Sequence, residues 1–544
     1  MRMVIAQLPA RKRVALFEYP ALPKYEIGFY LSVIFVGFFF AWYAVNEATN
    51  QFERLLADDL PIPRHYIPFF GYRYKDESNW EWGRWSPFAL SFLPYLAVSC
   101  LIFNVGEKFL SESVMPYVMI AYSAFACSQL FTGWLVVVSI LQGTFIFAMA
   151  TFTKRSLVVW VSGLPILYMV MNNSLDFNHD PFLVLIFASY TLLSYISFSL
   201  ETVKENLRDE DNTVWKRYVR MLFYTFYLPY VISLVVTYPD FEKQMSERAT
   251  RQRNWLQILW FAIRIAIYWV AVEVMLHIFY FEAMLNDPEF SYTLREDLYL
   301  AACMAFGQFF HLKYVVIFGV PAVFAKIDNM KPQKGPICMA AVALYSKMWR
   351  NFDRGLYSFF KQYIFIPIAA PTFSLSRKIF AVFVCYGFVL IWHGFNTSNY
   401  IWISLSISEL FLEYLGKGIY SIESVRKWRE EHIGDVAFRR IVAVLQEITM
   451  IPAIYGNYFF VCGPFIAYQT IERIWFEETL KLQYPLFILL ILGYIYVQMV
   501  LEIERQKSLC RKRRDDARKK EMEEAIEQEE QNDDNKDDMA KKVD

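Results

Sequence analysis

Two short stretches place groups that can transfer protons inside otherwise apolar sequence. In KMWRNFDRGLYSFFKQYIFIPIAAP (residues 347–371), Trp349, Arg350 and Asp353 precede a return to Phe, Ile and Pro. The later apolar run FAVFVCYGFVLIWHGF ends near a lone histidine, His393. Ionisable groups in hydrocarbon surroundings are costly and usually have a functional reason. Histidine is the side chain best suited to pass a proton near neutral pH.

Each of these residues also has a purely structural interpretation. Arg350 and Asp353 are three positions apart, so on one helix they would face each other and pair, and Arg354 is a second candidate partner. A single histidine in an apolar helix is more often a satisfied core residue than a catalyst. The combination of a Trp-Arg-x-x-Asp turn with a Trp-His-Gly turn at His393 favours the catalytic interpretation.

The sequence around Asp353 predicts a broken backbone rather than straight spanning helices. Six helix breakers interrupt residues 311–371, namely Pro321, Pro332, Gly335, Pro336, Pro367 and Pro371. Irregular backbone at membrane depth persists only where it is buried in protein or lines a wet cavity. We therefore predict that this segment forms the edge of a cavity.

The remainder of the chain has the composition of a membrane protein. Of its 544 residues, 56% are hydrophobic and 19% aromatic, and the mean hydropathy is +0.26, which is more apolar surface than one soluble core can bury. A spanning helix needs roughly 20 residues. Apolar runs near this length occur at 27–45, 86–105, 114–130, 131–152, 157–172, 181–200, 219–237, 256–281, 298–324, 378–394, 399–416, 441–468 and 485–502. Because some runs are short or interrupted, we predict an all-α polytopic membrane protein with roughly 10–12 tilted transmembrane helices and re-entrant segments.

Basic residues flank both ends of this apolar region. Arg11, Lys12 and Arg13 precede the first run, and RQKSLCRKRRDDARKK follows the last. By the positive-inside rule, both termini are predicted to be cytosolic. The tail is too charged to bury a core, so we expect it to be solvated and helical in its first half at most. The predicted regions are a cytosolic or interfacial segment 1–26, a transmembrane catalytic domain 27–502 and a charged cytosolic tail 503–544.

Other features bear on localisation and chemistry. The C-terminal Lys541-Lys542-Val543-Asp544 resembles a dilysine retrieval signal, although paired lysines also occur by chance. It favours the endoplasmic reticulum membrane, with the Golgi as an alternative.

The Trp- and Tyr-rich stretch 46–88 suits a lumenal interfacial anchor or a docking loop. The seven cysteines contain no C-x-x-C pair, so neither a disulfide framework nor a zinc site is supported. Cys510 is either a plain exposed thiol or a site of palmitoylation.

The stretches around Asp353 and His393 resemble the membrane-bound O-acyltransferase superfamily and, within it, the branch of hedgehog acyltransferases. The resemblance is carried by KYVVIFGVPAVFAKIDNM, MWRNFDRGLYSFFKQYIFIPI and VLIWHGFNTSNYIW, and more weakly by DFEKQM and GNYFFVCG. It extends over residues 20–502 and is strongest over 310–400. It implies tilted helices around a membrane-spanning tunnel, which acyl-coenzyme A enters from the cytosol and the acceptor enters from the lumen.

The same resemblance implies roles for individual residues. His393 and Asp353 would be the catalytic pair, and Trp349, Arg350 and Asn457 would line the acyl-coenzyme A site. Most of the superfamily has Asn where this chain has Asp353, whereas the hedgehog acyltransferases have Asp. Cys338 occupies the place of a cysteine that ligates haem iron in that branch. A single thiolate is enough for an axial ligand, so both a haem b protein and a haem-free one are consistent with the sequence.

The implied function is acyl transfer. A long-chain acyl group, palmitoyl, would move from acyl-coenzyme A to the N-terminal amine of a lumenal or secreted hedgehog-like protein. Membrane lipids are expected as surroundings, and no nucleic-acid partner is expected. One alternative is a lysophospholipid or glycerol-type lipid acceptor on the same machinery. Another is a non-catalytic transporter or scaffold, but the chain shows no duplicated halves of the kind that many transporters have.

Overall fold

The computed structural model describes residues 17–59, 64–171, 177, 179–204, 213–475 and 484–540. The chain divides into two compact units. The larger unit comprises Phe38–Phe411 and Ile451–Pro485, and the smaller unit comprises Met1–Gly37, Leu412–Met450 and Leu486–Asp544. Apart from one two-stranded hairpin, the regular elements of the described residues are helices. The predicted all-α class is therefore confirmed.

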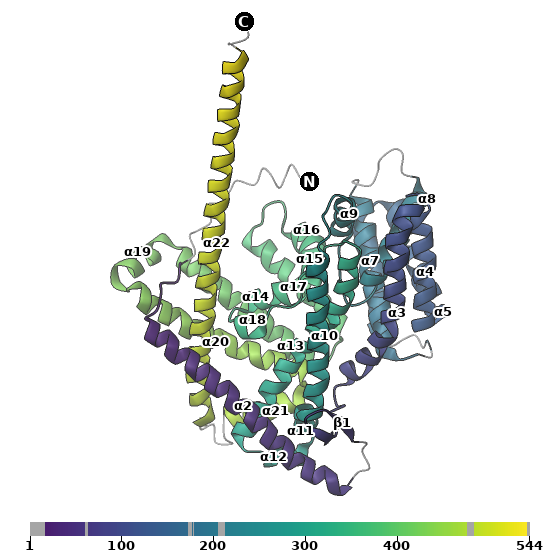
Figure 1. Cartoon of the computed structure of the whole chain (residues 1–544). Coiled ribbons are helices and arrows are strands. Elements are labelled where there is room, and N and C mark those ends of the chain that lie inside the picture. Colours follow the sequence, from purple (N-terminus) through teal and green to yellow (C-terminus); the bar gives the residue numbers. More distant parts are fainter. Residues whose placement is uncertain are drawn as a thin grey trace. The chain divides into compact units, whose positions relative to one another are not determined.

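The first part of the larger unit is a hairpin followed by long apolar helices. The antiparallel strands are β1 (His65–Ile67) and β2 (Gly71–Arg73). The helices that follow are α3 (Trp80–Phe109), α4 (Met115–Leu130), α5 (Gly133–Thr153), α6 (Ser156–Met171) and α7 (Pro181–Val203). Side chains of Asn79, Thr132 and Asp180 cap the N-termini of α3, α5 and α7. Helices α3, α4, α5 and α7 pack side by side (Figure 1).

The central part of the larger unit packs around one long helix. Its elements are α8 (Val214–Thr225), the 3-10 turn η1 (Leu228–Tyr230), α9 (Tyr238–Glu247), α10 (Trp255–Ile278), α11 (Phe281–Asn286), α12 (Pro288–Thr293) and α13 (Glu296–Ile327). Helix α13 contacts α3, α10 and α11. The long, mostly buried α13 thus ties the first helices of the unit to the segment that follows it.

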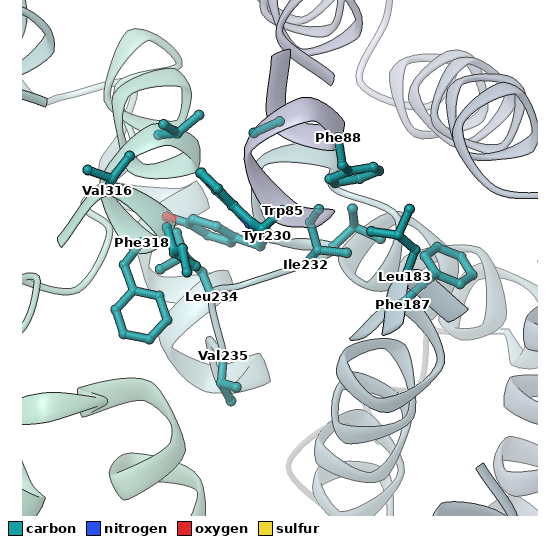
Figure 2. Packing of buried hydrophobic residues seen from close by; sticks show 14 of the residues in the cluster. Trp85, Phe88, Leu183, Phe187, Tyr230, Ile232, Leu234, Val235, Val316 and Phe318 are labelled. Atoms are coloured by element: carbon teal, nitrogen blue, oxygen red, sulfur yellow. The ribbon is translucent and has the colours of Figure 1, made fainter. Parts of the chain in front are cut away.

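The apolar run 219–237 does not form the continuous span that its hydropathy predicts. Helix α8 ends at Thr225, and residues 231–237 are buried without regular helical structure. Figure 2 shows Ile232 and Leu234 between the side chains of α13 and those of α7. Side chains satisfy the irregular backbone, because Tyr224 donates to the Val236 carbonyl and the Tyr238 N–H donates to Ser197. This segment is irregular backbone buried in protein, the condition under which such backbone persists at membrane depth.

The breaks predicted at Pro332, Gly335, Pro336 and Pro371 are confirmed, but those predicted at Pro321 and Pro367 are wrong, because Pro367 lies within the helical run 354–369. Pro321 lies inside α13, which continues to Ile327. Neighbouring helices can hold a helix together across one missing hydrogen bond. After α13 the chain forms short pieces: η2 (Met339–Ala341), α14 (Tyr345–Phe352), α15 (Arg354–Phe360), the π-helix η3 (Lys361–Phe365) and α16 (Ile366–Ala369). The later helices are α17 (Leu375–His393), α18 (Thr397–Ser421), α20 (Asp435–Val461) and α21 (Gly463–Ile474).

The smaller unit contains α19 (Glu423–His432), α22 (Tyr484–Ala540) and parts of α2 (Lys24–Asp59), α18 and α20. A fully buried arginine, Arg439, joins α20 to α22 by an ion pair with Glu502 at 3.0 Å and a hydrogen bond to Gln498.

Helix α22 continues to Ala540, so the charged tail is helical over a longer stretch than the sequence predicted. The expected boundary at residue 502 lies inside this helix. Residues 1–16 and the Lys541-Lys542 pair lie outside the described residues.

The structure supports a multi-pass membrane protein. In the described residues, eight helices are long and apolar enough to cross a membrane, namely α2, α3, α5, α7, α10, α13, α17 and α22. Helix α6 is apolar but shorter. The apolar runs at 114–130, 399–416 and 441–468 fold into α4, α18 and α20–α21, which are shorter or more polar. The stretch 46–88, expected as a loop, contains the end of α2, the β1–β2 hairpin and the start of α3.

Candidate active site

His393 is the last residue of α17 and is held there by its backbone. The following Gly394 has φ = +90°, a conformation that glycine adopts without strain, and it turns the chain toward α18. The Asn399 amide donates to the carbonyl of His393 at 2.7 Å and to the carbonyl of Gly394 at 2.8 Å. These bonds satisfy carbonyls that the end of a helix leaves without partners. The backbone of His393 is therefore fixed from two sides.

Aromatic rings surround the His393 imidazole. It meets Phe460 edge-on at 4.8 Å between ring centroids and Trp402 edge-on at 5.2 Å. Trp402 and Phe460 are themselves stacked at 4.0 Å. No side chain among the described residues forms a hydrogen bond with the imidazole, so its ring nitrogens remain available to a substrate. The site is an aromatic cluster that contains one group able to exchange a proton.

Trp349, predicted to line the acyl-coenzyme A site, belongs to the same aromatic cluster. Its ring stacks on Trp402 at 5.7 Å and meets Tyr386 edge-on at 5.6 Å. Trp402 thus contacts both His393 and Trp349, which are far apart in the sequence. The sequence predictions gave no role to Trp402 or Phe460. The sequence could have indicated both residues, because Trp402 lies in the stretch VLIWHGFNTSNYIW and Phe460 in the stretch GNYFFVCG, which carry the family resemblance.

Asp353 lies at the junction of two short helices. It follows the last residue of α14 and caps α15, since its carboxylate accepts a hydrogen bond from the Leu356 N–H at 2.9 Å. Asp353 lies outside the membrane-spanning helices, and burial raises the pKa of its carboxyl group to about 6. It therefore carries a negative charge at neutral pH and becomes protonated in mild acid.

The alternative ion pair of Asp353 with Arg350 or Arg354 does not form. The Arg350 guanidinium instead donates to the Ser346 carbonyl at 3.0 Å, because α14 ends before Asp353 and the two residues do not share a helix. Arg350 is exposed, and the Nε atom of Arg354 is buried without a hydrogen-bond partner among the described residues. The Asp353 charge is thus not neutralised by the neighbouring arginines.

Tyr190 of α7 connects the surroundings of Asp353 and His393. Its ring meets Trp392, the residue before His393, edge-on at 5.9 Å. Its hydroxyl group interacts electrostatically with the Asp353 carboxylate. Among the described residues, no hydrogen bond or ion pair joins Asp353 directly to His393. Asp353 and His393 thus form no bonded pair, and Tyr190 contacts Trp392, the residue before His393, while lying within electrostatic range of Asp353.

Asn457 lies beside the aromatic cluster. It is half-buried on α20, three positions before Phe460 and therefore on the same side of the helix. The adjoining Gly456 packs against Trp402 and Leu405. The Asn457 side chain forms no hydrogen bond within the described residues, so its amide can serve a bound polar group.

Cys338 lies apart from the aromatic cluster. It is exposed at the start of η2, and the N–H of the preceding Ile337 donates to the Asn351 carbonyl at 2.9 Å. An accessible thiol fits the requirement for one axial haem ligand, so the residue is compatible with the expected cofactor. The described residues contain no group of three or more His, Cys, Asp or Glu side chains that could hold a metal ion.

The helical fold, with its long apolar helices, defines a polytopic membrane protein, and His393 lies within an aromatic cluster of that fold. The chain belongs to the MBOAT, membrane-bound O-acyltransferase family, whose sequence model matches residues 85–455. It is accordingly an acyltransferase, as predicted.

Two individual relatives match over more of the chain than the family segment, and a third matches over less. The chain is 24% identical over 497 residues to protein-cysteine N-palmitoyltransferase HHAT of Mus musculus, which covers 89% of this chain and 98% of the relative. It is 26% identical over 450 residues to protein-cysteine N-palmitoyltransferase Rasp of Drosophila melanogaster, covering 80% and 86% of the two chains. Membrane-bound O-acyltransferase gup1 of Schizosaccharomyces pombe is 24% identical over 232 residues, 42% of this chain and 38% of the relative.

Proposed function

We propose that this protein transfers a long-chain acyl group, palmitoyl, from acyl-coenzyme A to the N-terminal amine of a lumenal or secreted hedgehog-like protein. The observation that carries the proposal is the near full-length similarity to two proteins named protein-cysteine N-palmitoyltransferases. The aromatic surroundings of His393 and the uncompensated charge of Asp353 support a site for acyl transfer. The expected tunnel between the two faces of the membrane is part of the proposal.

His393 is the proposed general base. A thioester is already activated, and an N-terminal amine titrates near 8, so a neutral amine is accessible at physiological pH. Its nitrogen attacks the thioester carbonyl carbon, and a C–N bond and an oxyanion form. The imidazole takes one proton from that nitrogen. When the oxyanion collapses, the C–S bond breaks and the leaving thiolate receives this proton. General base catalysis of this kind contributes about 10²- to 10⁴-fold.

The other candidate residues would bind and orient the two substrates. Asp353 would attract the cationic amine before it loses its proton. Arg350 and Asn457 would donate hydrogen bonds to the thioester carbonyl or the pantetheine, where donors aimed at developing charge contribute most. Trp349 would form a wall of the acyl-coenzyme A site. The surrounding apolar side chains would hold the acyl chain, at about 0.8 kcal/mol for each buried methylene.

The choice of acceptor is tested with peptides. The purified protein is incubated with labelled palmitoyl-coenzyme A, membrane lipids and a peptide whose N-terminus is free or acetylated, and lipid products are separated from peptide products. We expect label only on the free N-terminus. Label on both peptides would indicate side-chain acylation, and label confined to the lipids would indicate a lipid acceptor. Either result would contradict the proposal.

Haem binding by Cys338 is a separate part of the proposal. When bound, haem would add an iron centre, and no step of the acyl transfer above uses it. Protein expressed with haem available should show a Soret absorption band that Cys338→Ala removes while the variant still folds. A spectrum without this band would remove the cofactor from the proposal.

The proposed location is the endoplasmic reticulum membrane, with both termini in the cytosol. The basic residues that flank the apolar region and the C-terminal lysine pair support it. Protease digestion of sealed microsomes that carry a tag at either terminus tests the orientation. Protection of either tag would contradict the proposal.

A further inference from the structure

The part of α22 that follows its apolar residues lies beyond the segment matched by the family and contains none of the residues proposed for acyl transfer. Residues 485–501 are mostly apolar, whereas residues 507–520 contain eight cations and two acids. The cations are Lys507, Arg511, Lys512, Arg513, Arg514, Arg518, Lys519 and Lys520. All eight are exposed. A dense cationic segment therefore directly follows a membrane-spanning helix.

Four of these cations share one face of the helix. Lys507, Arg511, Arg514 and Arg518 are spaced by four, three and four residues, which aligns them at 3.6 residues per turn. We call these four residues the cationic stripe. It extends about 16 Å along the helix axis at a rise of about 1.5 Å per residue. The stripe is long enough to contact more than one lipid headgroup.

The cationic stripe has no ionic partner within the described side chains, which end at Glu524 in this helix. Lys512 pairs with Glu18 at 2.7 Å and Lys520 pairs with Glu524 at 3.6 Å, but both lie on the other side of the helix. Within the same described side chains, the stripe residues form no such pair. Their charge is directed to solvent or to an external anion.

The order of charges along α22 indicates what kind of external anion would bind the cationic stripe. After Lys520 the sequence EMEEAIEQEEQNDDNKDDMA carries ten acids and one lysine. A helix that only needed solubility could mix its charges along its length. Here the cations lie next to the membrane-spanning part and the acids lie far from it. An anionic membrane surface attracts the first group and repels the second, and this attraction is felt only within a Debye length, about 10 Å in 0.1 M salt.

We propose that the cationic stripe of α22 docks on the anionic headgroups of the leaflet in which the apolar part of the helix ends. Guanidinium and ammonium groups supply hydrogen bonds and charge to phosphate and carboxylate groups of lipids such as phosphatidylserine. Docking would hold the start of the tail at the membrane surface, while the acidic residues project away. The proposal depends on neither the acyl donor nor the acceptor.

A native cysteine of the full-length protein allows a fluorescent probe to be attached beside the cationic stripe. Cys510 lies at the edge of the stripe and is exposed, and Cys338 is the other exposed cysteine among the described residues. A polarity-sensitive fluorophore is attached to Cys510 in a Cys338→Ser background. The protein is then placed in lipid discs of phosphatidylcholine with or without phosphatidylserine. We expect a blue shift with phosphatidylserine in 0.1 M salt and its loss in 1 M salt, where the Debye length is about 3 Å.

Two matched variants separate docking of one face from the effect of total charge. The test variant is K507Q/R511Q/R514Q/R518Q, and the control is K512Q/R513Q/K519Q/K520Q on the opposite face. Both remove four cations from the same segment. The test variant should lose the response to phosphatidylserine, and the control should keep most of it. Equal loss in both variants, or no response in the native protein, would overturn the proposal. An equal response to soluble heparin in lipid-free detergent would also overturn it, because the stripe would then not be specific for a lipid surface.

Discussion

The side-chain amide of Asn399 donates a 2.7 Å hydrogen bond to the backbone carbonyl of His393. A second bond from the same amide reaches the Gly394 carbonyl at 2.8 Å. Asn399 is only 5% exposed, so water cannot easily replace these donors. The position of the proposed base therefore depends on a residue six positions later in the sequence, at the start of another helix.

Asn399→Leu should lower kcat about 10- to 100-fold, because small displacements of a catalytic group are costly. Leucine has a similar size but no donor. The KM for acyl-coenzyme A should change little, since Asn399 acts through His393. The control is Asn396→Ala, which removes the side-chain acceptor for the Asn399 N–H. This control should cost about 1 kcal/mol of stability and leave kcat unchanged. Native kcat in Asn399→Leu would contradict the positioning role.

His393→Gln should reduce acyl transfer by about 10²- to 10⁴-fold, the usual contribution of a general base. Glutamine fills much of the space between Trp402 and Phe460 but cannot exchange a proton near neutral pH. Binding of acyl-coenzyme A, measured by fluorescence quenching of the cluster tryptophans, should persist. Full activity in this variant would remove His393 from the mechanism.

Asp353→Asn and Asp353→Ala separate the charge of the residue from its capping role. Asparagine is also a good helix cap and can accept from the Leu356 N–H, whereas alanine cannot. Both variants should lose most acyl transfer, because both lack the carboxylate. Only Asp353→Ala should also lose about 1 kcal/mol of stability. If Asp353→Asn transfers acyl groups at the native rate, the charge is not required.

The pH dependence follows from the raised pKa of Asp353, about 6. The carboxylate is present above this pH, so acyl transfer should fall as the pH drops below about 6. Stability should change in the opposite direction. The folded protein binds this proton more tightly than the unfolded chain, whose aspartate titrates near 3.9. The contribution of the residue to stability is therefore greatest in acid and declines as the pH rises through the window from about 4 to 6. Asp353→Asn should remove this stability change, which thermal unfolding at several pH values would measure.

Gly355→Ala should destabilise the protein, because an added Cβ would collide with the Val235 carbonyl of the buried irregular segment. Overpacking of this kind costs about 1–3 kcal/mol and here would also displace the nearby Asp353. Gly387→Ala in α17 is the matched control, since a Cβ added at this residue would meet nothing within 4 Å. It should be neutral or stabilising by about 0.5–1 kcal/mol. Equal melting temperatures of the two variants would contradict the tight packing at Gly355.

Local sequence determined much of this protein. Runs of apolar residues predict membrane helices because hydropathy and length are local properties. The prolines after residue 331 predict the short helices around Asp353, since each removes a backbone donor where it stands. Asp353 and His393 became candidates because ionisable side chains in apolar surroundings are rare, and the motifs around them and the family resemblance favoured a catalytic role.

Packing between segments distant in the sequence determined the structural features that the local sequence did not predict. Pro321 remains inside a helix and residues 231–237 remain irregular because neighbouring helices, not their own sequence, stabilise them. Arg350 does not meet Asp353 because a helix ends between them. Trp402 joins His393 to Trp349, and Asn399 holds the His393 backbone, through contacts that exist only once α17, α18 and α20 are packed together. A linear pattern specifies which residues prefer to be buried, but their partners are chosen by the three-dimensional packing of the whole unit.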